Sequence, residues 1–164
     1  MPYNNIDAAL EYKLSNQIKQ ILGEAFIRKD VKADMEEATD FAVFTIAPFK
    51  VGVRLRRCQY YHDYSQQITI RWSRPSGAPT EIDKIRKDLV QFIMYGFVDL
   101  EETRIIQYII INAKILTHIQ PFEIKPNNPL DSYLAIFNRK QIPEQYEICF
   151  WRDKKYTNEL SEAV

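Results

Sequence analysis

The sequence predicts a single domain of the α/β or α+β class, with a central mixed β-sheet flanked by helices. The chain has 164 residues, which is enough for one domain with a hydrophobic core. Apolar residues make up 46% of it, close to the average for globular proteins. A segment of helical periodicity comes first, and strand-like segments, a short helix and further strand-like segments follow.

The first expected element is an amphipathic helix over residues 6–22. Asn5 is a suitable N-cap and Gly23 a suitable end. Glu11 falls at the edge of the apolar stripe, where a carboxylate either pairs with another group or reaches water. The stripe consists of Leu10, Leu14, Ile18, Ile21 and Leu22.

Three strands and a short helix are expected next. Residues 40–46 and 51–58 read as two strands, joined by a turn that contains a proline. Residues 66–72 form the third strand. Residues 80–88 form a short helix, because Thr80 precedes two acids in the manner of a capping box.

The segment 89–100 is compatible with a continued helix or with a strand. Its aromatic residues and Gly96 favour a strand. A turn at residues 99–103 then leads into another strand over residues 104–115.

The C-terminal part is expected to be less regular. Prolines favour a loop over residues 117–129. Short strands are expected at residues 132–138 and 145–151, and the polar tail after Trp151 is expected to fray.

The formal net charge is zero, which argues against a general nucleic-acid coat protein. Positive charge is nevertheless concentrated between residues 50 and 87, where the acids are only Asp63, Glu81 and Asp83. Two interpretations stay open, a local basic patch and an ordinary charged surface balanced by neighbours. The basic residues are Lys50, Arg54, Arg56, Arg57, Arg71, Arg74, Lys84, Arg86 and Lys87.

The sequence does not indicate a glycine-rich phosphate-binding loop or a zinc site. The chain has four glycines and lacks the G-x-G-x-x-G and P-loop motifs. His62 and His118 lie outside any zinc-ligand spacing, and Cys58 and Cys149 are expected to be free thiols. A signal peptide and a membrane-length apolar run are missing, so we expect a cytoplasmic protein without a membrane partner.

The segment around residues 40–57 carries the most specific chemistry. Because strand residues alternate between faces, Arg54 and Arg56 fall on the face opposite Val53 and Leu55. Asp40 begins the preceding strand. Metal-dependent nucleases place an acid and an i, i+2 pair on adjacent strands in this way, so that the acid holds Mg²⁺ and a lysine stabilises the phosphate charge.

These residues make the chain similar to the PD-(D/E)xK nuclease superfamily, in particular to small phage-type members. The likeness covers about residues 6–112, from a helix carrying Glu11 through "ATD" with Asp40 to a hairpin, a third strand, a helix and a further strand. It implies a restriction-endonuclease-like core with extra C-terminal strands in residues 113–164. It also implies Mg²⁺, or Mn²⁺, as cofactor, DNA as substrate and a homodimer.

The chain departs from the superfamily at its central motif. Arg54-Leu55-Arg56 stands where the family has (D/E)xK, and arginine does not bind Mg²⁺. In one explanation the acid has migrated to Glu81, with Lys84 as the lysine. In a second, Asp40 and Glu11 hold one metal ion and Arg56 replaces the lysine. In the third, the site has decayed and the protein only binds.

Candidate residues for DNA binding lie close to these positions. Arginine neutralises phosphate and tyrosine stacks on bases, although both residue types are also common in oligomer interfaces. The expected DNA-binding residues are Arg54, Arg57, Arg71, Arg74, Tyr60 and Tyr61.

Two functions are therefore expected. The first is a Mg²⁺-dependent DNA endonuclease, resolvase-like or phage-derived, with Asp40, Glu11 and Glu81 on the metal and Lys84 and Arg56 at the scissile phosphate. The second is an inactive relative that binds DNA or protein, for example a phage counter-defence protein.

Overall fold

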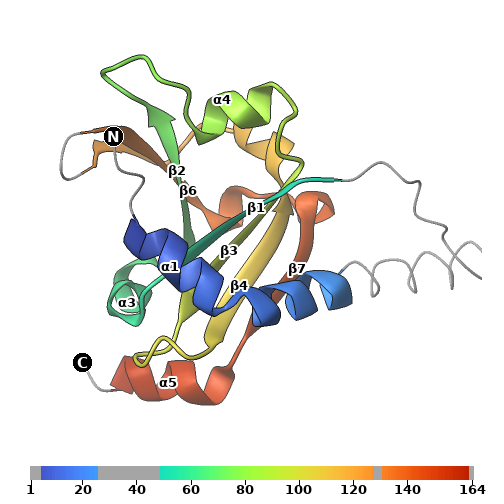
Figure 1. Cartoon of the computed structure of the whole chain (residues 1–164), viewed down its shortest axis with the longest axis vertical. Coiled ribbons are helices and arrows are strands. Elements are labelled where there is room, and N and C mark those ends of the chain that lie inside the picture. The colour runs from blue at the N-terminus through green and yellow to red at the C-terminus, as the bar shows by residue number, and fades with distance from the viewer. Residues whose placement is uncertain (1–4, 26–48, 128–130, 163–164) are drawn as a thin grey trace, which may run out of the picture.

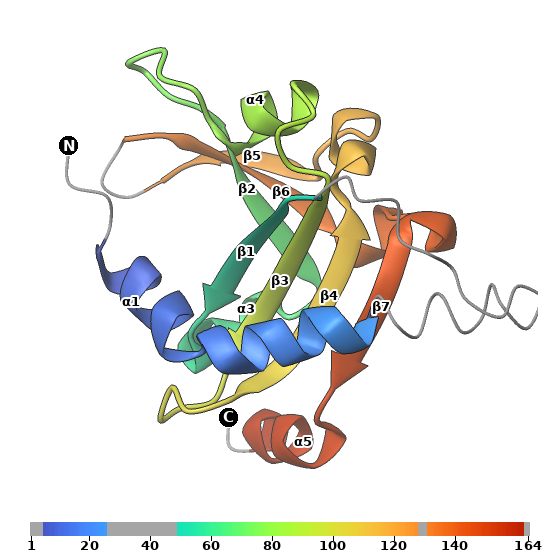
Figure 2. The same ribbon diagram turned by 45° about the vertical axis from the view of Figure 1, so that its right-hand side comes forward.

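The computed structural model describes residues 5–25, 49–127 and 131–162 (Figure 1). The described strands form two sheets that pack face to face, and helices cover the outside of the larger sheet and the ends (Figure 2). This arrangement confirms the mixed α and β class. The prediction of one central sheet is wrong, because the strands divide between two sheets.

The larger sheet, sheet A, has the strand order β1-β3-β4-β7. β1 pairs with β3 in parallel, and β3–β4 and β4–β7 are antiparallel. The chain leaves sheet A after β1 and returns to it at β3, which makes the sheet mixed. Its strands are β1 (Val51–Arg56), β3 (Phe92–Val98), β4 (Ile105–Asn112) and β7 (Glu147–Arg152).

The smaller sheet, sheet B, is fully antiparallel with the order β2-β6-β5. Sheet B contains β2, which lies between β1 and β3 in the sequence. The residues predicted as a loop at 117–129 contribute its edge strand. Its strands are β2 (Gln67–Ser73), β5 (Glu123–Pro126) and β6 (Tyr133–Asn138).

Helical segments lie around the two sheets. The predicted N-terminal helix is present as α1 (Asn5–Lys13) and a second helical stretch over residues 15–25, with a turn at Leu14. Asn5 lies inside the helix and Gly23 does not end it, so both predicted boundaries are wrong. The other segments are α3 (Tyr61–Tyr64), α4 (Glu81–Arg86), α5 (Lys154–Glu162) and the 3₁₀ turns Cys58–Tyr60, Ala113–Thr117, Arg139–Gln141 and Glu144–Tyr146.

The C-terminal tail forms a helix instead of fraying. The carbonyl oxygen of Asp153 accepts a hydrogen bond from Thr157 Oγ1 at 2.7 Å, and its carboxylate receives the N–H of Tyr156 at 3.2 Å. Thr157 is buried, and the Tyr156 hydroxyl receives the N–H of Leu100 in the turn after β3. Local hydrogen bonds of Asp153 therefore stabilise the first turn of this helix, and the contact between Tyr156 and Leu100 attaches it to the rest of the fold.

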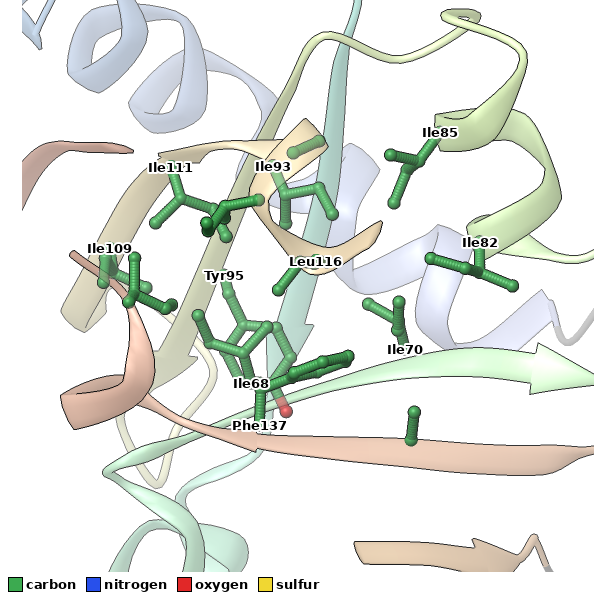
Figure 3. Packing of buried hydrophobic residues seen from close by; sticks show 14 of the residues in the cluster. Ile68, Ile70, Ile82, Ile85, Ile93, Tyr95, Ile109, Ile111, Leu116 and Phe137 are labelled. Atoms are coloured by element: carbon green, nitrogen blue, oxygen red, sulfur yellow. The ribbon is translucent and has the colours of Figure 1, made fainter. Parts of the chain in front are cut away.

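The core has two layers, one on each face of sheet A. Between the sheets, Ile93 and Tyr95 of β3 face Ile68 of β2 and Phe137 of β6 (Figure 3). Ile82 and Ile85 of α4 and Leu116 close one end of this layer. On the other face, the N-terminal helical stripe packs on Leu55, Met94, Val98, Tyr108 and Ile110.

The turn between β3 and β4 is organised by the buried carboxylate of Asp99. It accepts hydrogen bonds from the N–H groups of Thr103 (2.7 Å) and Arg104 (3.1 Å) and from Thr103 Oγ1 (2.7 Å). Burial raises the pKa of Asp99, but these hydrogen bonds and the charge of Arg104 outweigh burial and hold the pKa below its usual range. The predicted turn at residues 99–103 is confirmed.

The pKa of Asp99 predicts a pH-dependent contribution to stability. A carboxyl whose pKa is lower in the folded than in the unfolded state stabilises the fold above its unfolded pKa of about 3.9, and this contribution is lost as the pH falls through the folded pKa. Asp99→Asn should lower the free energy of unfolding at pH 7 by about 1–3 kcal/mol. Urea titrations should show this difference shrinking as the pH falls below about 4 and through the folded pKa. A difference independent of pH would contradict the assignment.

The close approach of β3 to β4 can be tested by substituting Gly96. A Cβ atom at Gly96 would lie 2.9 Å from the carbonyl oxygen of Gln107, whereas one at Gly23 would meet nothing within 4 Å. Gly96→Ala should therefore destabilise the protein by about 1–3 kcal/mol. Gly23→Ala, in a helix, should be neutral or stabilising by up to about 1 kcal/mol. Equal effects of the two changes on urea unfolding would argue against this strand packing.

Candidate functional site

The two arginines of β1 point toward the layer between the sheets. β1 pairs with β3 in parallel, so Arg54 lies beside Tyr95 on the side that faces sheet B. Val53 and Leu55 pack on the helical side. The predicted alternation of faces is confirmed, and both arginines are partly buried.

Glu81 joins the two sheets at this point. Its Oε1 forms an ion pair with Arg54 of β1, and its Oε2 accepts a hydrogen bond of 2.6 Å from the main-chain N–H of Arg71 on β2. Glu81 occupies the first position of α4, and Ile82 and Ile85 of this helix pack into the layer between the sheets. The carboxylate therefore links an edge strand of sheet A, an edge strand of sheet B and the helix between them.

The other predicted arginines also lie beside partners within the protein. Arg56 Nε donates a hydrogen bond of 3.0 Å to the hydroxyl of Tyr95, and Arg57 Nε contacts Glu102 Oε1 at 2.5 Å. Hydrogen bonds from Ser132 and Asn127 lower the pKa of Asp131, and the nearby charges of Arg71 and Arg74 lower it further. Ile70 of β2 faces sheet A. Because neighbouring side chains on a strand point to opposite faces, the side chain of Arg71 lies on the other face of sheet B and does not share a face with Arg54.

A small recess opens beside the Arg54–Glu81 pair. It has a volume of about 60 Å³. Arg54, Glu81 and Lys84 supply its charged groups. The other lining residues are apolar or aromatic, namely Gly52, Val53, Ile70, Ile85, Val90, Ile93 and Tyr95.

Exposed lysines gather at the same end of the molecule. Gln91 holds three segments together there, because its side chain receives the N–H of Lys50 at 2.7 Å and donates to the carbonyl of Asp88 at 2.6 Å, and its carbonyl receives the N–H of Ala113 at 2.9 Å. We call the exposed lysines carried by these segments and by α4 the lysine cluster. It consists of Lys50, Lys84, Lys87 and Lys114.

The charges of the lysine cluster are less well neutralised by nearby carboxylates than the charges of the arginines. Lys114 Nζ lies 3.9 Å from the exposed Asp88, a distance at which an exposed pair contributes little. Within the described residues, Lys50, Lys84 and Lys87 have no ion-pair partner within 4.0 Å. The sequence pointed to Lys50, Lys84 and Lys87 through the concentration of charge, but nothing in the sequence linked Lys114 to them.

The described members of the predicted metal site do not come together. Glu11 lies on α1, which packs on the helical face of sheet A, whereas Glu81 lies on α4, which closes the layer between the sheets. Both oxygens of Glu81 are engaged, by Arg54 and by the N–H of Arg71. Asp40 lies outside the described residues. In the described part of the chain, no three His, Cys, Asp or Glu side chains are grouped as metal ligands.

The two predicted tyrosines have different environments. Tyr61 is only 5% exposed, and its hydroxyl donates to Gln107 Oε1 at 3.0 Å while its ring packs edge-on against Phe97. Its predicted role as a base-stacking residue is wrong, because it belongs to the core. Tyr60 is 41% exposed, with Tyr64 beside it at a ring separation of 6.4 Å.

Comparison with protein-family models, curated proteins and solved structures finds no match for this chain. The resemblance to the PD-(D/E)xK superfamily therefore stays a prediction. Cys58 is a free, buried thiol, as expected. Within the described ranges, no helix combines the length and the hydropathy needed to cross a membrane.

The link made by Glu81 predicts a loss of stability when its charge is removed. Glu81→Gln removes the carboxylate charge that pairs with Arg54, and the two side chains are only 20% (Arg54) and 31% (Glu81) exposed. Partial solvent screening limits the cost, so we expect a decrease in the free energy of unfolding of about 1–2 kcal/mol.

The matched control for this change is Asp63→Asn. Asp63 pairs with His62 in a contact whose side chains are 67% and 60% exposed, so its loss should change stability by less than about 0.5 kcal/mol. Urea unfolding of both variants at neutral pH makes the comparison. Equal losses would show that the Arg54–Glu81 pair contributes no more than a surface contact.

Proposed function

We propose that the protein is a DNA-binding module without nuclease activity of its own. This is the DNA-binding form of the second expected function, an inactive relative that binds DNA or protein. The observation that supports it most directly is the lysine cluster. Exposed ammonium groups on one end of a chain with zero net charge form a local positive surface that suits a phosphate backbone.

The alternative, a Mg²⁺-dependent endonuclease, has less support from the described residues. Metal binding by Glu81 would require its carboxylate to leave Arg54 and the main chain of β2. That change would also break the partly buried ion pair between Arg54 and Glu81. Glu81 is therefore better suited to holding the two sheets together than to holding a metal ion.

Lysines contact phosphate as flexible point charges and read no base sequence. We therefore expect binding with little sequence preference and a strong dependence on salt. A homodimer and a cytoplasmic location stay predictions, and neither is needed for this mode of binding.

Fluorescence anisotropy with duplex, branched and single-stranded DNA tests the proposal. The double variant Lys87→Gln/Lys114→Gln should weaken binding about tenfold or more, and should reduce the slope of log affinity against log salt by about 1–2 units, because roughly 0.9 units accompany each phosphate contact.

The matched control is Lys154→Gln/Lys155→Gln, which removes the same charge from exposed residues of α5. It should change neither the affinity nor the salt slope by more than the experimental error. Equal effects of the two double variants would contradict binding through the lysine cluster.

The same DNA substrates, incubated with Mg²⁺ or Mn²⁺, test for nuclease activity. Cleavage that depends on metal and disappears in Asp40→Ala would overturn the non-catalytic function and establish the endonuclease. Binding without cleavage would support the module proposed here.

A further inference from the structure

The recess between β1 and α4 has the features of a binding site for a small molecule. Its walls come from four elements between residues 51 and 98, namely β1, β2, α4 and β3 with the residues before it. Ile70, Ile85 and Ile93 also belong to the core layer between the sheets, so the apolar wall is anchored in packed structure. A recess built on such a wall keeps its shape when a ligand enters.

Gly52 leaves part of this space open. It lies on the face of β1 that carries Arg54, and its position lines the recess. A Cβ atom there would meet Val90 Cγ1 at 3.4 Å and Ile93 Cγ1 at 3.9 Å, which are ordinary contact distances. The strand therefore accepts a side chain at this position, and that side chain would occupy the recess.

The charged groups at the recess favour an anion. Arg54 and Glu81 neutralise each other, and the exposed Lys84 adds one further positive charge. A carboxylate near Lys84 would gain a charge-assisted hydrogen bond without displacing the Arg54–Glu81 pair. A second cation at this position would be repelled by Lys84, because the Arg54–Glu81 pair is neutral as a whole.

The size of the recess limits the apolar part of the ligand. A cavity of 150 Å³ accommodates benzene, so the volume of about 60 Å³ suits a chain of roughly three carbon atoms. We propose that the recess binds a short-chain monocarboxylate, with its aliphatic tail beside Gly52, Ile70 and Ile93 and its carboxylate at Lys84. The proposal does not depend on DNA binding.

Nuclear magnetic resonance titration of the full chain tests the proposal with three probes. Isobutyrate supplies both the tail and the charge, acetate supplies the charge with a shorter tail, and 2-methylpropan-1-ol supplies the tail without the charge. Isobutyrate should shift the amide signals of Gly52, Lys84 and Val90 saturably. Acetate and the alcohol should each bind about tenfold more weakly or worse, since each lacks one of the two interactions.

Two variants and a control locate the site. Gly52→Val, which fills the recess, should abolish the isobutyrate shifts, and Lys84→Gln, a surface change, should weaken them about tenfold. Lys140→Gln removes an exposed lysine that does not line the recess and should leave them unchanged. Circular dichroism of each variant verifies folding, and Lys84→Gln keeps the test decisive if Gly52→Val does not fold.

Two results would overturn the proposal. The first is that isobutyrate produces no saturable shifts in the wild-type protein, or shifts equal to those of acetate. The second is that Lys84→Gln and Lys140→Gln bind isobutyrate equally well.

Discussion

The burial of β3 and β4 on both faces is the constraint on which the rest of the structure depends. On β3, Ile93, Tyr95 and Phe97 face sheet B, whereas Met94 and Val98 face the N-terminal helix. A sheet with two apolar faces needs two covers. The helical stripe of residues 10–25 supplies one cover and sheet B supplies the other, so the fold needs the N-terminal helix together with strands that lie between residues 67 and 138.

This constraint also determines what happens to the arginines of β1. β1 is joined to β3 in parallel, so the face of β1 that carries Arg54 and Arg56 is turned toward sheet B. Guanidinium groups at the margin of an apolar layer need partners, because desolvation of an unpaired charge is costly. Glu81 and the hydroxyl of Tyr95 provide these partners. The arginines that the sequence suggests for contact with phosphate are therefore largely engaged by partners within the folded protein.

The short helix α4 connects the structural and the proposed functional roles. Glu81 at its start joins the two sheets, Ile82 and Ile85 close the core, and Lys84 lies at the recess. Lys87, directly after the helix, belongs to the lysine cluster. Because the capping box of Thr80 and Asp83 fixes the start of this helix, one local sequence motif positions all of these groups.

Local patterns were sufficient for most of the elements. The apolar stripe from Leu10 to Ile21, the alternation along residues 51–56 and the capping box at Thr80 each depend on neighbours in the chain, and the structure confirms all three. Segments held by distant contacts were missed. β5 is ordered by pairing with β6, and α5 is attached by the contacts of Tyr156 with Leu100 and of Asp153 with Arg104, which their own sequences do not reveal.

The sequence by itself determined which faces of the elements are apolar and where positive charge is concentrated. Only the tertiary structure decided which charges remain available, because pairing joins residues from distant segments. Arg54 meets Glu81 across 27 positions of the chain, and Arg57 meets Glu102 across 45. The segments of Lys50 and Lys114 come together through the strand pairing of Val51, Phe92 and Asn112 and through the hydrogen bonds of Gln91. The candidate site is therefore a property of the folded chain, since no local pattern encodes these distances.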